Sequence, residues 1–213
     1  MQNQVQPLRA RLEAELNRPA VLLVTSATQE DGKSVTAFGL ATSFSEAGYR
    51  SVLIDANPLR PQLKHLRALG NLAADGPALD SYAYDDPDDN VCAIRLVESE
   101  EAAALSLRQI QALTDQCRLS YDYTIVDGSD FFSTGLPALL AKCVDGVLIA
   151  LRHGRRPGDS DALLVQAVEE TGTPVLGVVL VESSSRKAFS ARYQRARSEP
   201  FVAPGILSPG EAL

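Results

Sequence analysis

The sequence has no excess of positive charge and no long hydrophobic run. Its 213 residues carry a formal net charge of −7, so no basic surplus exists to neutralise nucleic-acid phosphates, and we expect no nucleic-acid partner. No apolar run approaches the roughly 18–20 residues that cross a bilayer. Residues 1–7 lack the basic and apolar regions of a signal peptide. These absences predict a cytoplasmic protein whose membrane role, if it has one, acts through a partner.

Residues suited to metal or nucleophilic chemistry are also scarce. The three cysteines, Cys92, Cys117 and Cys143, do not have the spacing of metal ligands, which favours reduced thiols in or near the core. No Ser or Cys has a matching His–Asp context, so we expect both histidines to be polar surface residues. The function must therefore be sought in other motifs.

Alternating apolar and helical stretches predict an α/β fold. Near-continuous apolar runs, typical of strands covered on both faces, occupy residues 20–25, 51–54, 123–126, 146–151 and 175–181. Helical patterns occupy residues 5–17, 33–47, 100–119, 136–142 and 159–171. This order predicts a mostly parallel sheet with right-handed crossovers and helices on both faces.

The composition along the chain predicts one domain and a tail. Residues 1–182 are expected to form a nucleotide-binding domain, with residues 1–18 as its N-terminal helix. Residues 183–213 are first basic and then rich in Pro and Gly, which is typical of a flexible segment that could also touch acidic lipid. Residues 70–95 hold clustered aspartates and are expected to form a solvated acidic loop.

The most informative stretch is Ala-Thr-Gln-Glu-Asp-Gly-Lys-Ser at residues 27–34, between the first predicted strand and a helix. This is the context of a phosphate-binding P-loop, although a Gly-containing turn without a ligand is the alternative. Lys33 would reach the β- and γ-phosphates of ATP or ADP, and the Ser34 hydroxyl would bind Mg²⁺. The dipole of the helix that begins here would stabilise a bound anion by roughly 0.3–1 kcal/mol. The predicted cofactor-binding residues are Thr28, Gln29, Glu30, Asp31, Gly32, Lys33, Ser34 and Val35.

Two aspartates are predicted at the carboxyl ends of strands, where ligands bind in such sheets. Asp55 follows the run 51–54 and Asp127 follows the run 123–126. An Asp after an apolar strand beside a P-loop is the Walker B arrangement, which holds Mg²⁺ directly or through water. We therefore predict Lys33, Asp55 and Asp127 as catalytic residues and Ser34, Asp55 and Asp127 as Mg²⁺ ligands. Lys33 is expected to face solvent.

Three arginines, Arg152, Arg155 and Arg156, lie just past a predicted strand end on the same side. They could clamp phosphate or meet a neighbouring subunit. A solvated basic turn is the alternative.

Together these motifs resemble the bacterial tyrosine kinases, within the wider group of partitioning and septum-site ATPases. Residues 25–34 resemble the family's Thr-Ser-Ala-x-Pro-Gly-Glu-Gly-Lys-Ser, residues 121–127 resemble its second acidic motif, and the likeness spans residues 20–181. The resemblance implies a P-loop NTPase-like fold that binds ATP or ADP with Mg²⁺. It also implies a role in capsule or exopolysaccharide export, with the protein located at the inner face of the membrane. A membrane chain-length regulator, or polysaccharide co-polymerase, is the implied partner, and a homo-oligomer is one possible assembly.

The chain departs from the family pattern at positions that matter for catalysis. Asn57 replaces the second carboxylate of Asp-x-Asp-x-Arg-x-Pro, and an amide cannot accept a proton at neutral pH. After Asp127 the chain has residues 128–130, Gly-Ser-Asp, where the family usually has Thr-Pro-Pro. Residues 181–182, Val-Glu, stand where an Asn often reads the base. Glu30 places a like charge near the phosphates.

These departures leave three functions open. A nucleotide-binding, pseudokinase-like regulator is favoured because Asn57 lacks the carboxylate and because Tyr193 is the lone tyrosine of the tail. An active tyrosine autokinase is the alternative. A partitioning-type ATPase is the second alternative, although Thr28 replaces that group's signature lysine. In the N-terminal helix, Arg9 alone remains of the family's Glu-x-x-Arg-x-x-Arg, which weakens the case for a ring.

Overall fold

The structure is a computed structural model that describes residues 2–60, 69, 84–86, 91–96 and 105–182. These residues form one seven-stranded sheet with the strand order β3-β4-β2-β5-β1-β6-β7. The strands are β1 (Ala20–Ser26), β2 (Ser51–Ala56), β3 (Tyr84–Asp86), β4 (Val91–Arg95), β5 (Tyr123–Asp130), β6 (Gly146–Arg152) and β7 (Val175–Val181). The helices are α1 (Gln2–Glu15), α2 (Lys33–Glu46), α3 (Leu107–Ser120), α4 (Leu136–Ala141) and α5 (Asp159–Glu170).

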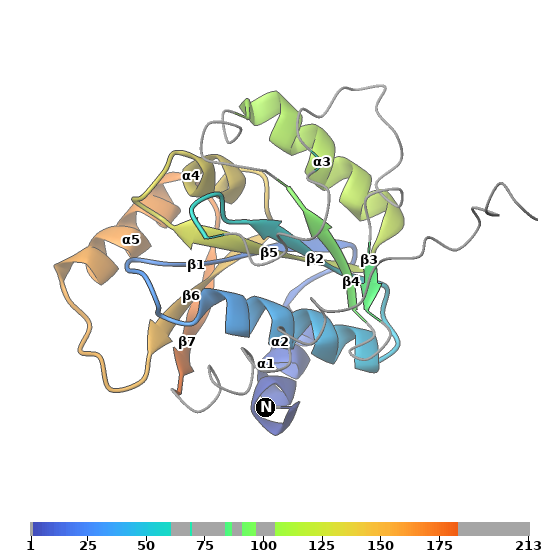
Figure 1. Cartoon of the computed structure of the whole chain (residues 1–213), viewed down its shortest axis with the longest axis horizontal. Helices are drawn as coiled ribbons and strands as arrows, with labels where there is room; N and C mark the ends of the chain where they lie inside the picture. Colours follow the sequence, from blue (N-terminus) through green and yellow to red (C-terminus); the bar gives the residue numbers. More distant parts are fainter. Residues whose placement is uncertain (1, 61–68, 70–83, 87–90, 97–104, 183–213) are drawn as a thin grey trace, which may run out of the picture.

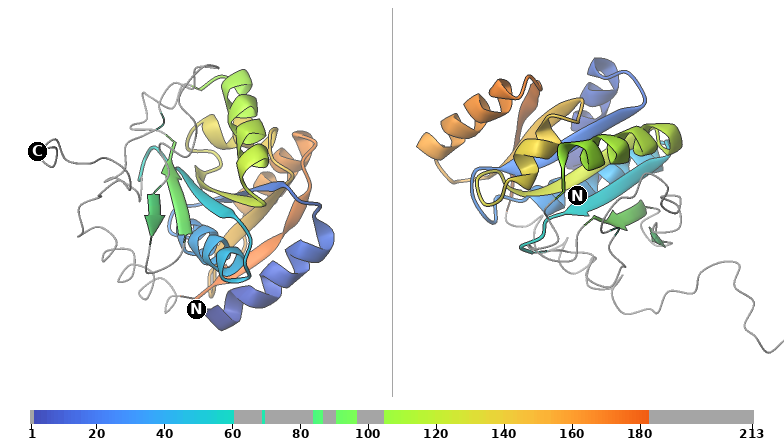
Figure 2. Two further views of the ribbon diagram at one scale, coloured as in Figure 1. Left: turned by 90° about the vertical axis from the view of Figure 1, so that its right-hand side faces the viewer. Right: turned by 90° about the horizontal axis from the view of Figure 1, so that it is seen from above.

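The predicted α/β architecture is confirmed. Six strands, β4, β2, β5, β1, β6 and β7, pair in parallel, and β3 pairs antiparallel with β4. Helices α1 and α2 lie on one face of the sheet, and α3 and α4 lie on the other (Figures 1 and 2). Within the part of the chain that the structure describes, no helix has the length and apolar character needed to cross a bilayer.

The expectation of an acidic loop over residues 70–95 is wrong for the part that the structure describes. Residues 91–95 form β4, which pairs in parallel with β2, and residues 84–86 form the short edge strand β3. Val91 and Ile94 in β4 are buried. The apolar stretch Val-Cys-Ala-Ile closely follows the aspartate cluster, so its burial against β2 was not evident from composition.

The strands alternate their side chains between two hydrophobic layers. Leu23, Ile54 and Val126 belong to the layer beneath α3, α4 and α5. Leu22 and Ile125 belong to the layer beneath α1 and α2. This period of two along strands that are buried on both faces explains why their sequences are almost continuously apolar. The core thus fixes β1, β2 and β5 at the centre of the sheet.

The strand register sets which residues meet at the carboxyl edge of the sheet. Asp55 in β2 lies opposite Asp127 in β5. Between β1 and β5 the register shifts: Val24 lies opposite Asp127, but Ser26 lies opposite Asp130. Two residues along β1 are therefore matched by three along β5, as at a β-bulge. The shift brings Asp130 beside the loop that follows β1.

Candidate nucleotide-binding site

The predicted P-loop connects β1 to the first turn of α2. Gly32 precedes the helix with φ of 97°, and its carbonyl accepts the backbone N–H of Thr36 at 3.0 Å. A Cβ on Gly32 would lie 2.6 Å from Cγ1 of Val181, at the end of β7. Glycine is therefore required here twice over, by its backbone conformation and by the close approach of β7.

The loop is closed by its own side chains. The Thr28 hydroxyl donates to the Asp31 carboxylate at 2.6 Å, and the Ser26 hydroxyl donates to the Thr28 carbonyl at 2.5 Å. Gln29 and Glu30 are exposed, and Glu30 adopts a left-handed backbone conformation with φ of 63°. The hydroxyl of Thr28, at the place of the partitioning ATPases' signature lysine, thus contributes to the shape of the loop.

Asp31 is fully buried in the loop and is paired with an arginine from the β6–α5 connection. Arg155 reaches both Asp31 oxygens from its Nε and Nη2 atoms, each at 3.0 Å, and it also binds Asp161 of α5. Hydrogen bonds to Asp161 and Asp31 raise the pKa of Arg155, and the pairing lowers the pKa of Asp161. Arg155 therefore neutralises a buried carboxylate, a structural role that sequence reasoning did not consider for the three arginines.

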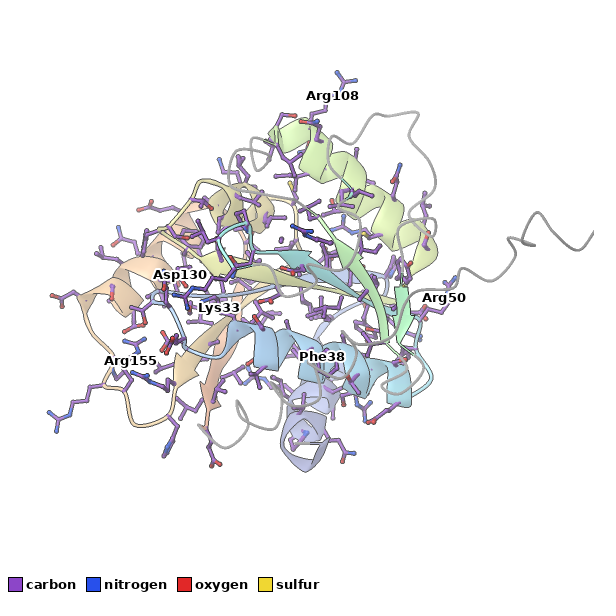
Figure 3. All side chains as sticks on the ribbon, viewed as in Figure 1. Lys33, Phe38, Arg50, Arg108, Asp130 and Arg155 are labelled. Atoms are coloured by element: carbon purple, nitrogen blue, oxygen red, sulfur yellow. The ribbon has the colours of Figure 1, made fainter. Side chains whose placement is uncertain are left out.

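Lys33 does not face solvent, contrary to the sequence-based expectation. Its side chain is 7% exposed, and its ammonium donates to Asp130 Oδ1 at 2.5 Å, to Ser26 Oγ at 3.0 Å and to the Thr28 carbonyl at 3.4 Å. Figure 3 shows Lys33 and Asp130 side by side at the start of α2. The expectation failed because Asp130 is 97 residues away in sequence and reaches Lys33 through the shifted register of β5.

Asp127, Asp55 and Ser34 come together beside the loop. Asp55 and Asp127 are almost fully buried, and Ser34 forms a side-chain hydrogen bond with Asp127. Burial raises the pKa of Asp127 to about 7, and the Asp55 charge adds to the rise, whereas Ser34 and the Lys33 charge lower it. The Asp127 Oδ1 atom has no hydrogen-bond partner among the described residues. A buried carboxylate oxygen without a partner is costly unless a cation or a proton satisfies it.

This donor set suits Mg²⁺. The ion prefers oxygen ligands and is commonly held by one or two carboxylates together with substrate phosphates. Two neighbouring carboxylates, one of them with an unpartnered oxygen, and a serine hydroxyl match that requirement. When bound here, Mg²⁺ would neutralise charge on nucleotide phosphates.

Asn57 lies just beyond β2 and is used in a turn. Its backbone N–H donates to Asp55 Oδ1 at 3.2 Å, and its side-chain oxygen accepts the backbone N–H of Arg60 at 3.1 Å. The side-chain oxygen, the atom nearest in character to the missing carboxylate, is therefore engaged in local structure. Val35 contributes to the core under α2, so it can serve a ligand through its backbone alone.

Sequence reasoning missed two residues that shape the site. Asp130 pairs with Lys33, and Val181 covers Gly32. Both stand at positions where the chain departs from the family pattern, and that departure was the available signal. His65, Tyr193 and the whole predicted tail lie outside the described residues.

Comparison with known proteins supports the resemblance. No protein-family profile matches the chain. A curated relative, the tyrosine-protein kinase CpsD of Streptococcus agalactiae serotype Ia, is 23% identical over 194 residues, covering 85% of this chain and 82% of CpsD. Several other bacterial tyrosine-protein kinases match at similar identity. The curated relatives thus confirm the family resemblance that the motifs predict.

Solved structures share the fold. The kinase domain of the Escherichia coli tyrosine kinase ETK superposes with a TM-score of 0.72 at 20% identity, covering 95% of this chain and 79% of that domain. Cobyrinic acid a,c-diamide synthase of Mycobacterium smegmatis, solved with an ATP analogue and magnesium, gives a TM-score of 0.63 at 16% identity, with coverage of 87% and 83%. The fold is therefore that of a P-loop NTPase.

Proposed function

We propose, for this member of the bacterial tyrosine kinase family, a regulatory role in exopolysaccharide biosynthesis or export that depends on bound ATP or ADP. The observation that carries the proposal is the convergence of Ser34, Asp55 and Asp127 beside the Gly32–Lys33 loop, with the Asp127 Oδ1 atom left without a partner among the described residues. This is an arrangement that binds phosphates and Mg²⁺ together.

The chain's own groups would divide the work of binding. Backbone N–H groups at the start of α2 would face the phosphates, and the helix dipole would favour their negative charge. Lys33 would supply a cation at the same helix end, and Asp55, Asp127 and Ser34 would supply oxygen ligands for Mg²⁺. A structural neighbour at 16% identity, cobyrinic acid a,c-diamide synthase, was solved with an ATP analogue and magnesium, which supports this choice of ligands.

The side-chain chemistry and the contacts of Asn57 favour a regulatory role over kinase activity. A kinase needs a group that accepts the proton of the acceptor hydroxyl, and an amide cannot do so at neutral pH. The Asn57 oxygen is also engaged with the backbone of Arg60. We therefore propose nucleotide binding with weak or no phosphoryl transfer. The intact pair Asp55 and Asp127 supports an active autokinase as the alternative.

We further propose that the protein acts at the inner face of the membrane by docking on a chain-length regulator. The family resemblance supports this partner. Co-expression of the full chain with the regulator from the same organism, followed by membrane fractionation, tests it: the chain should move to the membrane fraction when the regulator is present. Identical fractionation with and without the regulator would remove this part of the proposal.

Two measurements on the full chain test the central function. Thermal unfolding with Mg·ATP at ~100 times its dissociation constant should show a stabilisation of roughly 2.7 kcal/mol. A phosphotyrosine blot of the wild type should be negative after incubation with Mg·ATP, and Asn57→Asp should increase Mg²⁺ dependence. Phosphotyrosine on the wild type that disappears in Asp127→Asn would instead establish the autokinase.

A further inference from the structure

We propose that Asp130 is a positioning residue that sets the affinity of the site for phosphate, because its carboxylate holds the Lys33 ammonium at the carboxyl end of β5. The nucleotide must compete with this carboxylate for Lys33. The inference rests on the proposed nucleotide-binding function and adds to it a residue that controls the nucleotide affinity of the site.

The contacts of Lys33 account for its whole donor capacity. An ammonium group has three N–H donors, and Lys33 has three acceptors: Asp130 Oδ1, Ser26 Oγ and the Thr28 carbonyl. The Lys33 and Asp130 side chains are 7% and 11% exposed. Solvent therefore screens the pair only weakly, and a phosphate that takes a Lys33 donor must displace an existing acceptor.

Asp130 is held more firmly than an ordinary surface aspartate. The register shift places it opposite Ser26, and the next residue, Phe131, donates its backbone N–H to the Ser26 carbonyl at 2.9 Å. On the other side, Ser133 donates both its backbone N–H, at 3.0 Å, and its hydroxyl, at 2.6 Å, to the Asp130 carbonyl. Because the Asp130 backbone is fixed on both sides, the flexible Lys33 side chain is the partner that must move.

The buried acidic residue of the loop is not available to Lys33. Asp31, buried two residues before Lys33, is already paired with Arg155. The Lys33 charge is therefore matched by Asp130 before any ligand arrives, and an entering phosphate exchanges one anionic partner for another instead of meeting an unpaired cation. Replacing Asp130 by the isosteric Asn keeps the shape and a hydrogen-bond acceptor but removes the competing charge.

A purely structural role makes a different prediction. If Asp130 only stabilises the fold, Asp130→Asn lowers the stability of the chain. Its nucleotide affinity is then the same as that of the wild type, or lower. If Asp130 competes with phosphate, Asp130→Asn lowers the stability of the unliganded chain and at the same time tightens Mg·ATP binding. The second effect must pass through Lys33, so it must vanish when Lys33 is replaced by Met.

The test is isothermal calorimetry of Mg·ATP and Mg·ADP with the full chain. We expect Asp130→Asn to lower the dissociation constant about tenfold. Asp130→Ala, a second variant without the carboxylate, should shift it in the same direction. On the Lys33→Met background, which should not bind, Asp130→Asn should not restore binding. Asp145→Asn is the matched control, because Asp145 pairs with Arg118 away from the loop, and its affinity should equal that of the wild type.

The outcomes separate the two proposals. If the wild type binds and neither Asp130 variant binds more tightly, Asp130 is structural, this inference is overturned and the nucleotide-binding function stands. If the wild type and both Asp130 variants all fail to bind, both proposals are overturned. If Asp130→Asn binds where the wild type does not, Asp130 closes a competent site and both proposals are supported.

Discussion

Asp55 and Asp127 lie opposite each other on neighbouring parallel strands, both almost fully buried. Two carboxylates so placed disfavour each other's charge, and burial disfavours it further, so the pKa of Asp127 rises from 3.8 to about 7. Such a pair lowers the stability of the fold when no cation is bound, and it attracts a cation. The energetic cost leads directly to a measurable dependence of stability on pH.

The first prediction concerns that dependence. Between about pH 4 and pH 7 the folded chain holds an Asp127 proton that the unfolded chain has lost, so the free energy of unfolding should fall as pH rises through this window. The shift corresponds to at most roughly 4 kcal/mol. Urea unfolding of the wild type and of Asp127→Asn at several pH values measures it. The variant should lose most of the slope, and equal slopes would contradict the account.

The second prediction concerns the Lys33–Asp130 pair. Lys33→Met leaves the Asp130 carboxylate buried and unpaired, so unfolding should become easier by roughly 3 kcal/mol. The double variant Lys33→Met with Asp130→Asn removes both charges and should recover most of that loss. Chemical denaturation of the three proteins provides the values. Additive losses in the double variant would mean that the two charges do not stabilise each other.

The fold was predictable because its signal is local. The apolar runs that became β1, β2, β5, β6 and β7 are each long enough to be recognised alone, and burial on both faces makes them continuous. The strand β4 was missed because its apolar stretch closely follows a cluster of aspartates, whose composition favoured a loop.

The site was only partly predictable, since its pairings depend on register. The phosphate loop follows β1, and the two aspartates lie near the carboxyl ends of β2 and β5, so sequence order alone brings them to one edge. The contacts of Lys33 with Asp130 and of Asp31 with Arg155 join residues 97 and 124 positions apart. A one-residue shift in register between β1 and β5, which no sequence pattern reveals, decides the first of them.

A third prediction concerns Glu30, which occupies a left-handed conformation where the family pattern has Gly. Glu30→Gly should stabilise the fold by roughly 0.5–1 kcal/mol, because Gly adopts this conformation without steric cost. It should also tighten Mg·ATP binding by removing a negative charge from the loop. Its ion pair with Arg60, at 3.7 Å between exposed side chains, should contribute little.

Glu30→Gln separates the two effects in that experiment. This variant removes the charge and keeps the conformational cost, so it should improve ATP affinity without improving stability. Thermal unfolding and calorimetry of both variants give the comparison. A stability gain in Glu30→Gln equal to that of Glu30→Gly would show that backbone strain is not the cause.

The fourth prediction concerns the contact between Gly32 and β7. Gly32→Ala introduces a Cβ within 2.6–2.9 Å of three Val181 side-chain carbons and at φ of 97°, so stability should fall by roughly 2 kcal/mol or more. Adding Val181→Ala should remove the stability loss that comes from the steric contact and leave the loss that comes from the backbone conformation. If Gly32→Ala is as stable as the wild type in denaturant unfolding, β7 does not approach the loop as described.

The most direct test of the central claim is a calorimetric titration of Mg·ATP into the wild type and into the charge-neutral variant Lys33→Met with Asp130→Asn. The double variant removes both charges of the Lys33–Asp130 pair, and its denaturant unfolding shows whether a loss of binding comes with a folded chain. The account predicts saturable one-site binding to the wild type and none to the variant. Equal binding to both proteins, or no binding to the wild type, would contradict it.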